Sequence, residues 1–140
     1  MLLHIIARGK IGRSSEAELV ERYLKRIAWS TRVSELPDHG GTVPPPPPNS
    51  VTIALDERGE ALSSMALAMK LEAWRDGGKR EARFFIGAAD GHGEKGRAGA
   101  DLLLSFGPAT WPHLLARAML AEQLFRATAI LANHPYHRDG

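Results

Sequence analysis

The 140-residue sequence contains no cysteine, which excludes disulfides, thiolate metal sites and a cysteine nucleophile. It has no apolar run near the roughly 20 residues that a membrane-spanning helix needs. The opening "MLLHIIARGK" is too short in its apolar part for a signal peptide, and no small-residue cleavage site is evident. These absences fit one domain, residues 1–140, of a cytoplasmic protein. A net charge of +2 permits an RNA partner without establishing one.

Several catalytic motifs are missing as well. There is no G-x-S-x-G nucleophile elbow, and Ser105 stands at an expected strand end without the glycine frame of a serine hydrolase. No Lys-Ser/Thr pair completes a phosphate-binding P-loop. Histidines 92, 113, 134 and 137 do not follow a known metal spacing, and Pro135 interrupts the last two. We therefore expect no metal site and no hydrolase.

What is present is an alternation of short apolar runs with amphipathic stretches. Such alternation predicts an α/β fold with a mostly parallel sheet flanked by helices. The "DERG" that follows Leu55 predicts a turn. Ser14 or Ser15 is suited to cap the first helix, and Gly77-Gly78 to end the second. The expected strands are residues 2–8, 32–36, 51–55, 82–87 and 100–107, and the expected helices begin after residues 14 or 15, at residues 63 or 64, and at about His113, the last running to Leu131.

A proline-rich stretch, "PDHGGTVPPPPPNS" at about residues 37–50, interrupts this alternation. Five consecutive prolines exclude a helix or a central strand and favour polyproline II. Because the stretch lies between two core elements, we interpret it as a stiff surface loop rather than as a ligand for an SH3-type domain.

Ligands of open parallel sheets bind beyond the carboxyl ends of the strands. Three short loops rich in small residues occupy such positions, after Leu55, Ile86 and Ser105. The glycine-rich loop at residues 86–96 is suited to cradle a phosphate or another ligand with backbone N–H groups, or simply to adopt positive φ. Without further information the second interpretation is slightly favoured.

The last expected helix is apolar on more than one side, which is typical of a central element or of a subunit interface. Arg117, Glu122 and Arg126 follow helical spacing and predict an ordinary surface network of charged pairs. Behind this helix the chain ends in "NHPYHRDG", an unusual concentration of histidine, tyrosine and arginine for a terminus.

This ending is specific. "TWPHLLARAMLAEQLFRATAILANHPYHR" resembles the PH-x-L-x-R…EQL-Y-R-A…HPYH-R ending of the RlmH family, SPOUT-class methyltransferases that act on N3 of a pseudouridine in large-subunit ribosomal RNA. Other stretches are similar in the same order: "IIARGKI…ERYLKRI" is similar to the opening strand and helix, "IALDERG" to the LDxxG strand and turn, and "FFIGAADG" to the IGGPEG loop. The similarity covers nearly the whole chain.

The resemblance implies a fold, a cofactor and partners. It implies a C-terminal trefoil knot at about residues 82–140, S-adenosyl-L-methionine as methyl donor, no metal, and assembled ribosomes as substrate. It also implies a homodimer formed through the C-terminal helix, with the tail of the chain lying across a cofactor site. The implied cofactor-binding residues are Leu55, Gly87, Phe106, Gly107, Pro108, Ala109, Thr110 and Trp111.

The resemblance leads to a hypothetical catalytic set of four residues, His113, Tyr136, His137 and Arg138. Arg138 is suited to stabilise the anionic base or bind phosphate, and His137 or His113 to position the base or remove its proton. Tyr136 is suited to stack or to donate a hydrogen bond. Helix capping by His113 and simple packing by Tyr136 are the structural alternatives. Basic residues at positions 8, 10, 13, 22, 25 and 26 are candidates for RNA contact, or are merely solvated helix charges.

Two other functions remain open, the first of them because "GAADG" replaces the family's "GGPEG". One is an RNA-associated protein that binds the cofactor without catalysis. The other is a methyltransferase for a different RNA.

Overall fold

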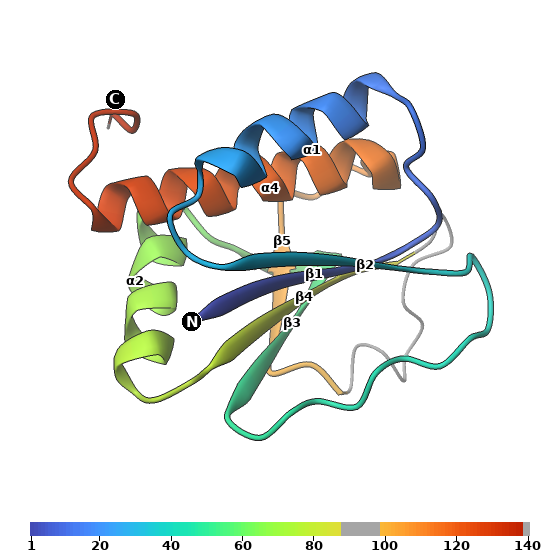
Figure 1. Ribbon diagram of the computed structural model, residues 1–140, viewed down its shortest axis with the longest axis horizontal. Coiled ribbons are helices and arrows are strands. Elements are labelled where there is room, and N and C mark those ends of the chain that lie inside the picture. Colours follow the sequence, from blue (N-terminus) through green and yellow to red (C-terminus); the bar gives the residue numbers. More distant parts are fainter. Residues whose placement is uncertain (88–98, 139–140) are drawn as a thin grey trace.

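The structure is a computed structural model that describes residues 1–87 and 99–138. It confirms the predicted α/β class (Figure 1). The glycine-rich loop and His92 lie outside the described residues, and so does the path of 88–98 on which the predicted knot depends. The elements are β1 (Leu2–Arg8), α1 (Ser15–Arg26), β2 (Thr31–Leu36), β3 (Ser50–Ala61), α2 (Ser64–Asp76), β4 (Glu81–Ile86), β5 (Leu102–Ser105) and α4 (His113–Leu131).

The five described strands form one sheet in the order β2-β1-β4-β3-β5, and every pairing is parallel. The three helices of the described residues cover one face of this sheet, with α1 and α4 side by side (Figure 1). Because parallel strands point the same way, the carboxyl ends of β3, β4 and β5 meet at one edge of the sheet.

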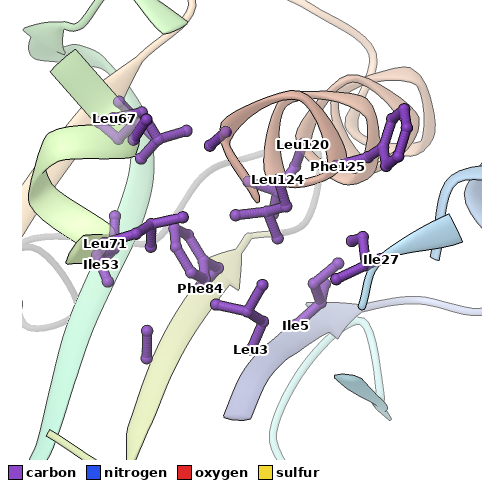
Figure 2. Close-up of a cluster of buried hydrophobic side chains, with 14 of the residues drawn as sticks. Leu3, Ile5, Ile27, Ile53, Leu67, Leu71, Phe84, Leu120, Leu124 and Phe125 are labelled. Carbon is purple, nitrogen blue, oxygen red and sulfur yellow. The ribbon is translucent and has the colours of Figure 1, made fainter. Parts of the chain in front are cut away.

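The core lies between the sheet and the helices. Figure 2 shows side chains of the strands, among them Leu3 and Phe84, directed toward Leu120 and Leu124 of α4. These four side chains are at most 1% exposed, so the interior is closely filled. Burial of this apolar surface is the main source of stability, at roughly 25 cal/mol per Å² removed from water.

Local signals place the helices where the sequence predicts them. The Ser14 hydroxyl accepts a hydrogen bond from the Ala17 N–H at 3.1 Å, and Ser63 caps α2 in the same way at Ala66. Such caps stabilise a helix by about 1 kcal/mol each. The second helix ends at Gly77, as predicted.

The opposite face of the sheet is covered in part by the proline segment, defined here as residues 37–49, which is exposed throughout, as predicted for a surface loop. Two arginines of the sheet hold it through backbone carbonyls. Arg8 donates to Pro37 and Gly40, and the buried Arg83 donates to Pro44. The proline segment is therefore attached to the sheet at its start and near its middle.

The turn predicted at "DERG" is wrong. Strand β3 continues through this stretch to Ala61, with a shift in its register against β5 between Leu55 and Glu60. The irregularity needs Gly59, because a Cβ there would lie 2.6 Å from the backbone carbonyl of Leu103. Polar residues and a glycine signal a turn locally, but the pairing with β5 converts the stretch into an irregular strand.

We expect Gly59→Ala to destabilise the fold by about 1–3 kcal/mol, because the added methyl group meets rigid backbone. Urea denaturation measures this loss. Glu60→Ala is the matched control, since the side chain of Glu60 is exposed and its removal is expected to change stability by less than about 0.5 kcal/mol. Equal stability of the two variants would contradict the close approach of β5.

Candidate functional site

The three loops predicted to bind a ligand lie on adjacent strands. Leu55 of β3 is in register with Leu104 of β5, and Ala54 with Phe85 of β4. Gly87 directly follows β4. The sheet thus brings Leu55, Gly87 and Ser105 to neighbouring strands, but the chain continues as a strand after Leu55, and residues 88–98 lie outside the described residues.

The loop between β5 and α4 is held by a compact hydrogen-bond network. The buried Ser105 hydroxyl accepts from the Gly107 N–H at 3.0 Å and donates to the Gly107 carbonyl at 2.8 Å. Glu57 accepts from Thr110 at 2.9 Å, and the Trp111 indole donates to the Phe106 carbonyl at 3.3 Å. The sequence did not indicate that Ser105 and Glu57 hold this loop through their side chains. Glu57 was missed because it lies in the stretch that was expected to be a turn.

Gly107 adopts a φ of +105°, a conformation that favours glycine. A Cβ added there would meet no atom of the described residues within 4 Å. Conformation rather than space therefore requires glycine at this position, and the space beside its backbone is open to a ligand.

A largely apolar groove of about 590 Å³ opens beside this loop. Its volume lies in the range of sites for small organic ligands. The groove reaches from Phe106 and Gly107 to the start of α2 and to the middle of α4. Its polar side chains are Tyr23, Ser63, Ser64, Ser105, Glu122 and Gln123.

The other predicted cofactor residues do not line this groove. Gly87 lines a second cavity of about 330 Å³, between the sheet and the proline segment. Pro108, Ala109, Thr110 and Trp111 are exposed in the loop. Phe106 and Gly107 are therefore the predicted residues that the groove and the loop have in common.

His113 begins α4 and lies beside the β1–α1 loop. A Cβ added at Gly9 would lie 3.6 Å from the His113 Nε2 and 2.9 Å from an Asp38 oxygen. The N-cap of α4 is Pro112, without a side-chain cap in the described part of the chain. Helix capping does not account for His113, and its role as a base stays a prediction.

The tail folds back onto α4. The Tyr136 hydroxyl donates to Glu122 at 3.1 Å, and its ring lies 4.6 Å from the ring of Phe125. A hydrogen bond of 3.2 Å connects Nη1 of Arg126 with Nδ1 of His137. Packing is therefore one role of Tyr136, as the structural alternative proposed, while Arg138 is exposed at the end of the described chain.

Burial raises the pKa of Tyr136 to about 12, and its hydrogen bonds with Tyr23 and Glu122 act in the same direction. The phenol therefore stays protonated near neutral pH and serves as a donor to the Glu122 carboxylate.

The structure does not bring His113 and the tail together within one chain. His113 begins α4, whereas His137 contacts Arg126 near the other end of the helix. At ~1.5 Å per residue, the rise from residue 113 to residue 126 is roughly 20 Å. A single chain thus separates two parts of the predicted catalytic set.

The predicted charge network on α4 is correct for one pair and wrong for Arg117. Glu122 and Arg126 form a 2.6 Å ion pair. Arg117 is only 1% exposed and pairs with Glu35 of β2 at 2.6 Å, while donating to the Gly9 carbonyl at 3.0 Å. Arg117 lies three residues before Leu120, which is buried, and residues at this spacing share one face of a helix. This spacing was the feature of the sequence that could have indicated the burial of Arg117.

Several of the basic residues proposed to contact RNA have partners within the chain. Arg8 donates to the proline segment, and Lys25 pairs with Glu21 at 3.0 Å. Arg26 lies over the ring of Phe125. The remaining residues of that set, which are exposed, are Lys10, Arg13 and Arg22.

Residues 1–87 and 99–138 contain no cluster of three side chains suited to hold a metal ion. None of the helices described is long and apolar enough to cross a membrane.

The fold is shared with a solved structure, a probable methylase family protein from Haemophilus influenzae Rd KW20. The TM-score is 0.60 at 11% identity, over 98% of this chain and 70% of the other. A family model described as a predicted SPOUT methyltransferase matches residues 42–137. The chain thus has the parallel α/β fold, a groove beside a loop, and a match to the family model. Together these features define a SPOUT methyltransferase.

Sequence relatives narrow the family. Proteins named ribosomal RNA large subunit methyltransferase H from Rhizorhabdus wittichii and Novosphingobium aromaticivorans are each 68% identical to this chain, over the whole of both chains. One from Rhodospirillum centenum is 42% identical over 99% of both chains. The chain belongs to the ribosomal RNA large subunit methyltransferase H (RlmH) family of SPOUT methyltransferases, which confirms the family resemblance.

Proposed function

We propose that this protein transfers a methyl group from S-adenosyl-L-methionine to N3 of a pseudouridine in large-subunit ribosomal RNA, acting on assembled ribosomes in the cytoplasm. The observation that carries the proposal is the loop after Ser105, whose backbone is fixed by side chains beside a groove of suitable size. The names of the relatives support large-subunit ribosomal RNA as the substrate.

The residues present fit the cofactor. A nucleoside with an amino-acid tail needs apolar surface and a few polar groups, and the groove offers both. Phe106 and Gly107 would hold it, together with Leu55, Gly87 and the exposed loop residues 108–111. When bound, the cofactor supplies an activated methyl group on a sulfonium.

The chain's own residues then position the base and favour its deprotonated form. Arg138 stabilises the negative charge that develops when N3 loses its proton. His137 or His113 orients the base or accepts that proton, because histidine titrates near neutral pH. Tyr136, held neutral, anchors the tail that carries His137 and Arg138.

A homodimer through α4 completes this site. Within one chain roughly 20 Å of helix rise separates His113 from the residue that contacts His137. A second copy packed against α4 places its tail across the cofactor groove of the first. The exposed Lys10, Arg13 and Arg22 of both copies then provide contacts to RNA phosphates.

The test is methyl transfer from labelled cofactor to purified ribosomes that lack the modification, followed by mass spectrometry of the nucleosides. N3-methylpseudouridine is the expected product. A folded dimer that binds cofactor and ribosomes without transfer would point instead to the non-catalytic protein. Transfer to deproteinised RNA but not to ribosomes would indicate a different RNA substrate.

Gly107→Ala is expected to weaken cofactor binding about tenfold, because the substituted residue disfavours a φ of +105° and the loop moves. Isothermal titration with S-adenosyl-L-methionine measures the dissociation constant. Gly40→Ala is the matched control. Gly40 also has positive φ, +70°, and an added Cβ meets nothing described within 4 Å, but it lies in the proline segment. Equal affinities of the two variants would remove Gly107 from the site.

A further inference from the structure

Helix α1 contributes to the place where the tail is bound. Arg26, in the last turn of α1, has its guanidinium carbon 4.3 Å from the centroid of the Phe125 ring and 5.4 Å from that of Tyr136. Arg126 of α4 lies 4.7 Å from the Tyr136 centroid. The tyrosine ring is thus contacted by two guanidinium groups that belong to different helices.

We infer that Arg26 is a positioning residue for methyl transfer, an inference that rests on the proposed function. Glu122 fixes the Tyr136 hydroxyl, and Arg26 and Arg126 fix its ring. A hydroxyl bond alone leaves a ring free to pivot, whereas contacts to the ring determine its direction. Arg26 therefore sets the direction in which the tail continues to His137 and Arg138.

The chemistry of the contact requires arginine. A planar guanidinium covers two aromatic rings at once, which the compact ammonium of lysine does not reproduce. A phosphate contact, by contrast, tolerates lysine. The neighbouring Lys25 shows the difference, because it points to Glu21 and makes an exposed ion pair with it. Arg26 and Lys25 carry the same charge on the same turn but contact different partners.

Three variants test the inference: Arg26→Gln, Arg26→Lys and, as the control, Lys25→Gln. Hydrogen exchange of the amides in residues 132–138, measured on the dimer without cofactor or RNA, reports how firmly the tail is held. Steady-state methyl transfer to unmodified ribosomes at saturating cofactor separates kcat from the KM for ribosomes. Thermal melting reports the stability of the rest of the chain.

Both Arg26 variants are expected to increase tail exchange roughly twofold to fivefold, the range that the loss of a cation–π contact at an exposed residue gives. The same variants are expected to lower kcat by a similar factor while the KM for ribosomes is unchanged. Lys25→Gln is expected to change neither quantity.

Three results would overturn the inference. If Arg26→Lys keeps full activity and Arg26→Gln raises only KM, Arg26 is a phosphate contact. Faster tail exchange with unchanged kcat would reduce Arg26 to a purely structural role. Unchanged tail exchange in both variants would show that Arg26 does not hold the tail. Failure of the wild-type protein to transfer methyl would instead overturn the proposed function, and the exchange data would still decide whether Arg26 holds the tail.

Discussion

Glu35→Ala is expected to lower the free energy of unfolding by about 3 kcal/mol, because it leaves the guanidinium of Arg117 buried without its counter-charge. The opposite change, Arg117→Met, is expected to cost only about 1–2 kcal/mol. Glu35 keeps a third of its side chain exposed and can be hydrated, while the Gly9 carbonyl loses one donor. Removal of Glu35 is therefore expected to cost more stability than replacement of Arg117.

A double-mutant cycle measures this asymmetry by urea denaturation. Once Arg117 is methionine, removal of Glu35 is expected to cost little, so that the double variant resembles Arg117→Met. The coupling energy then has a magnitude of about 3 kcal/mol, the full cost of Glu35→Ala. Additive costs would show that the buried guanidinium does not depend on Glu35.

The same pair gives stability a pH dependence of known sign. Burial alone raises the pKa of Glu35, but its bonds with Arg117 and the Ile11 N–H outweigh this and lower the pKa below 4.5. A lowered folded-state pKa contributes stability that is present above pH 4.5 and is lost as pH falls through the folded value. The stability difference between wild type and Glu35→Ala is therefore expected to shrink in acid. A difference that grows below pH 4.5 would reverse the assigned sign.

Arg138→Ala is expected to reduce methyl transfer by at least about 100-fold, the effect of removing one group that stabilises a developing anion. Because Arg138 is exposed at the end of the described chain, its loss is expected to leave folding, dimerisation and cofactor affinity unchanged. Single-turnover methyl transfer to ribosomes measures the chemical step, and titration calorimetry and light scattering measure the other two properties.

Arg32→Ala serves as the matched control for Arg138→Ala, since Arg32 is an exposed arginine on the edge strand β2. It is expected to keep methyl transfer at the wild-type rate. Transfer at the wild-type rate in Arg138→Ala would remove this arginine from the chemistry. An equal loss in both variants would show that net charge, rather than the tail, governs the rate.

Helices and strands that depend on residues close by in the sequence could be predicted from it. Strand β1 and helix α4 have the bounds that their patterns indicate, and Ser14 and Ser63 cap helices because their hydroxyls lie one turn from free N–H groups. The neighbouring positions of β3, β4 and β5 in a parallel sheet follow from the predicted fold class, whereas the binding of a ligand beyond their carboxyl ends stays a prediction.

What could not be predicted depends on partners far away in the sequence. Arg117 is buried because Glu35, 82 residues earlier, neutralises it. The stretch after Leu55 is a strand because β5 pairs with Glu60 and Ala61. Arg26 is exposed, as the sequence indicates, but its contacts with two rings could not be predicted, because these rings lie on another helix and in the tail. Local composition contains no information about such contacts.

The strand order also governs when this chain can fold during its synthesis. Strand β1 pairs with β2 on one side and β4 on the other, and Leu3 meets Ala82 in the second pairing. Strand β1 is therefore made before β4 and stays unpaired on that side until residues 81–86 have emerged from the ribosome. Until then the run "LLHIIA" is exposed to aggregation and to chaperones. Because the tail packs on α1 and α4, it takes up this position only after residues 134–138 have emerged as well.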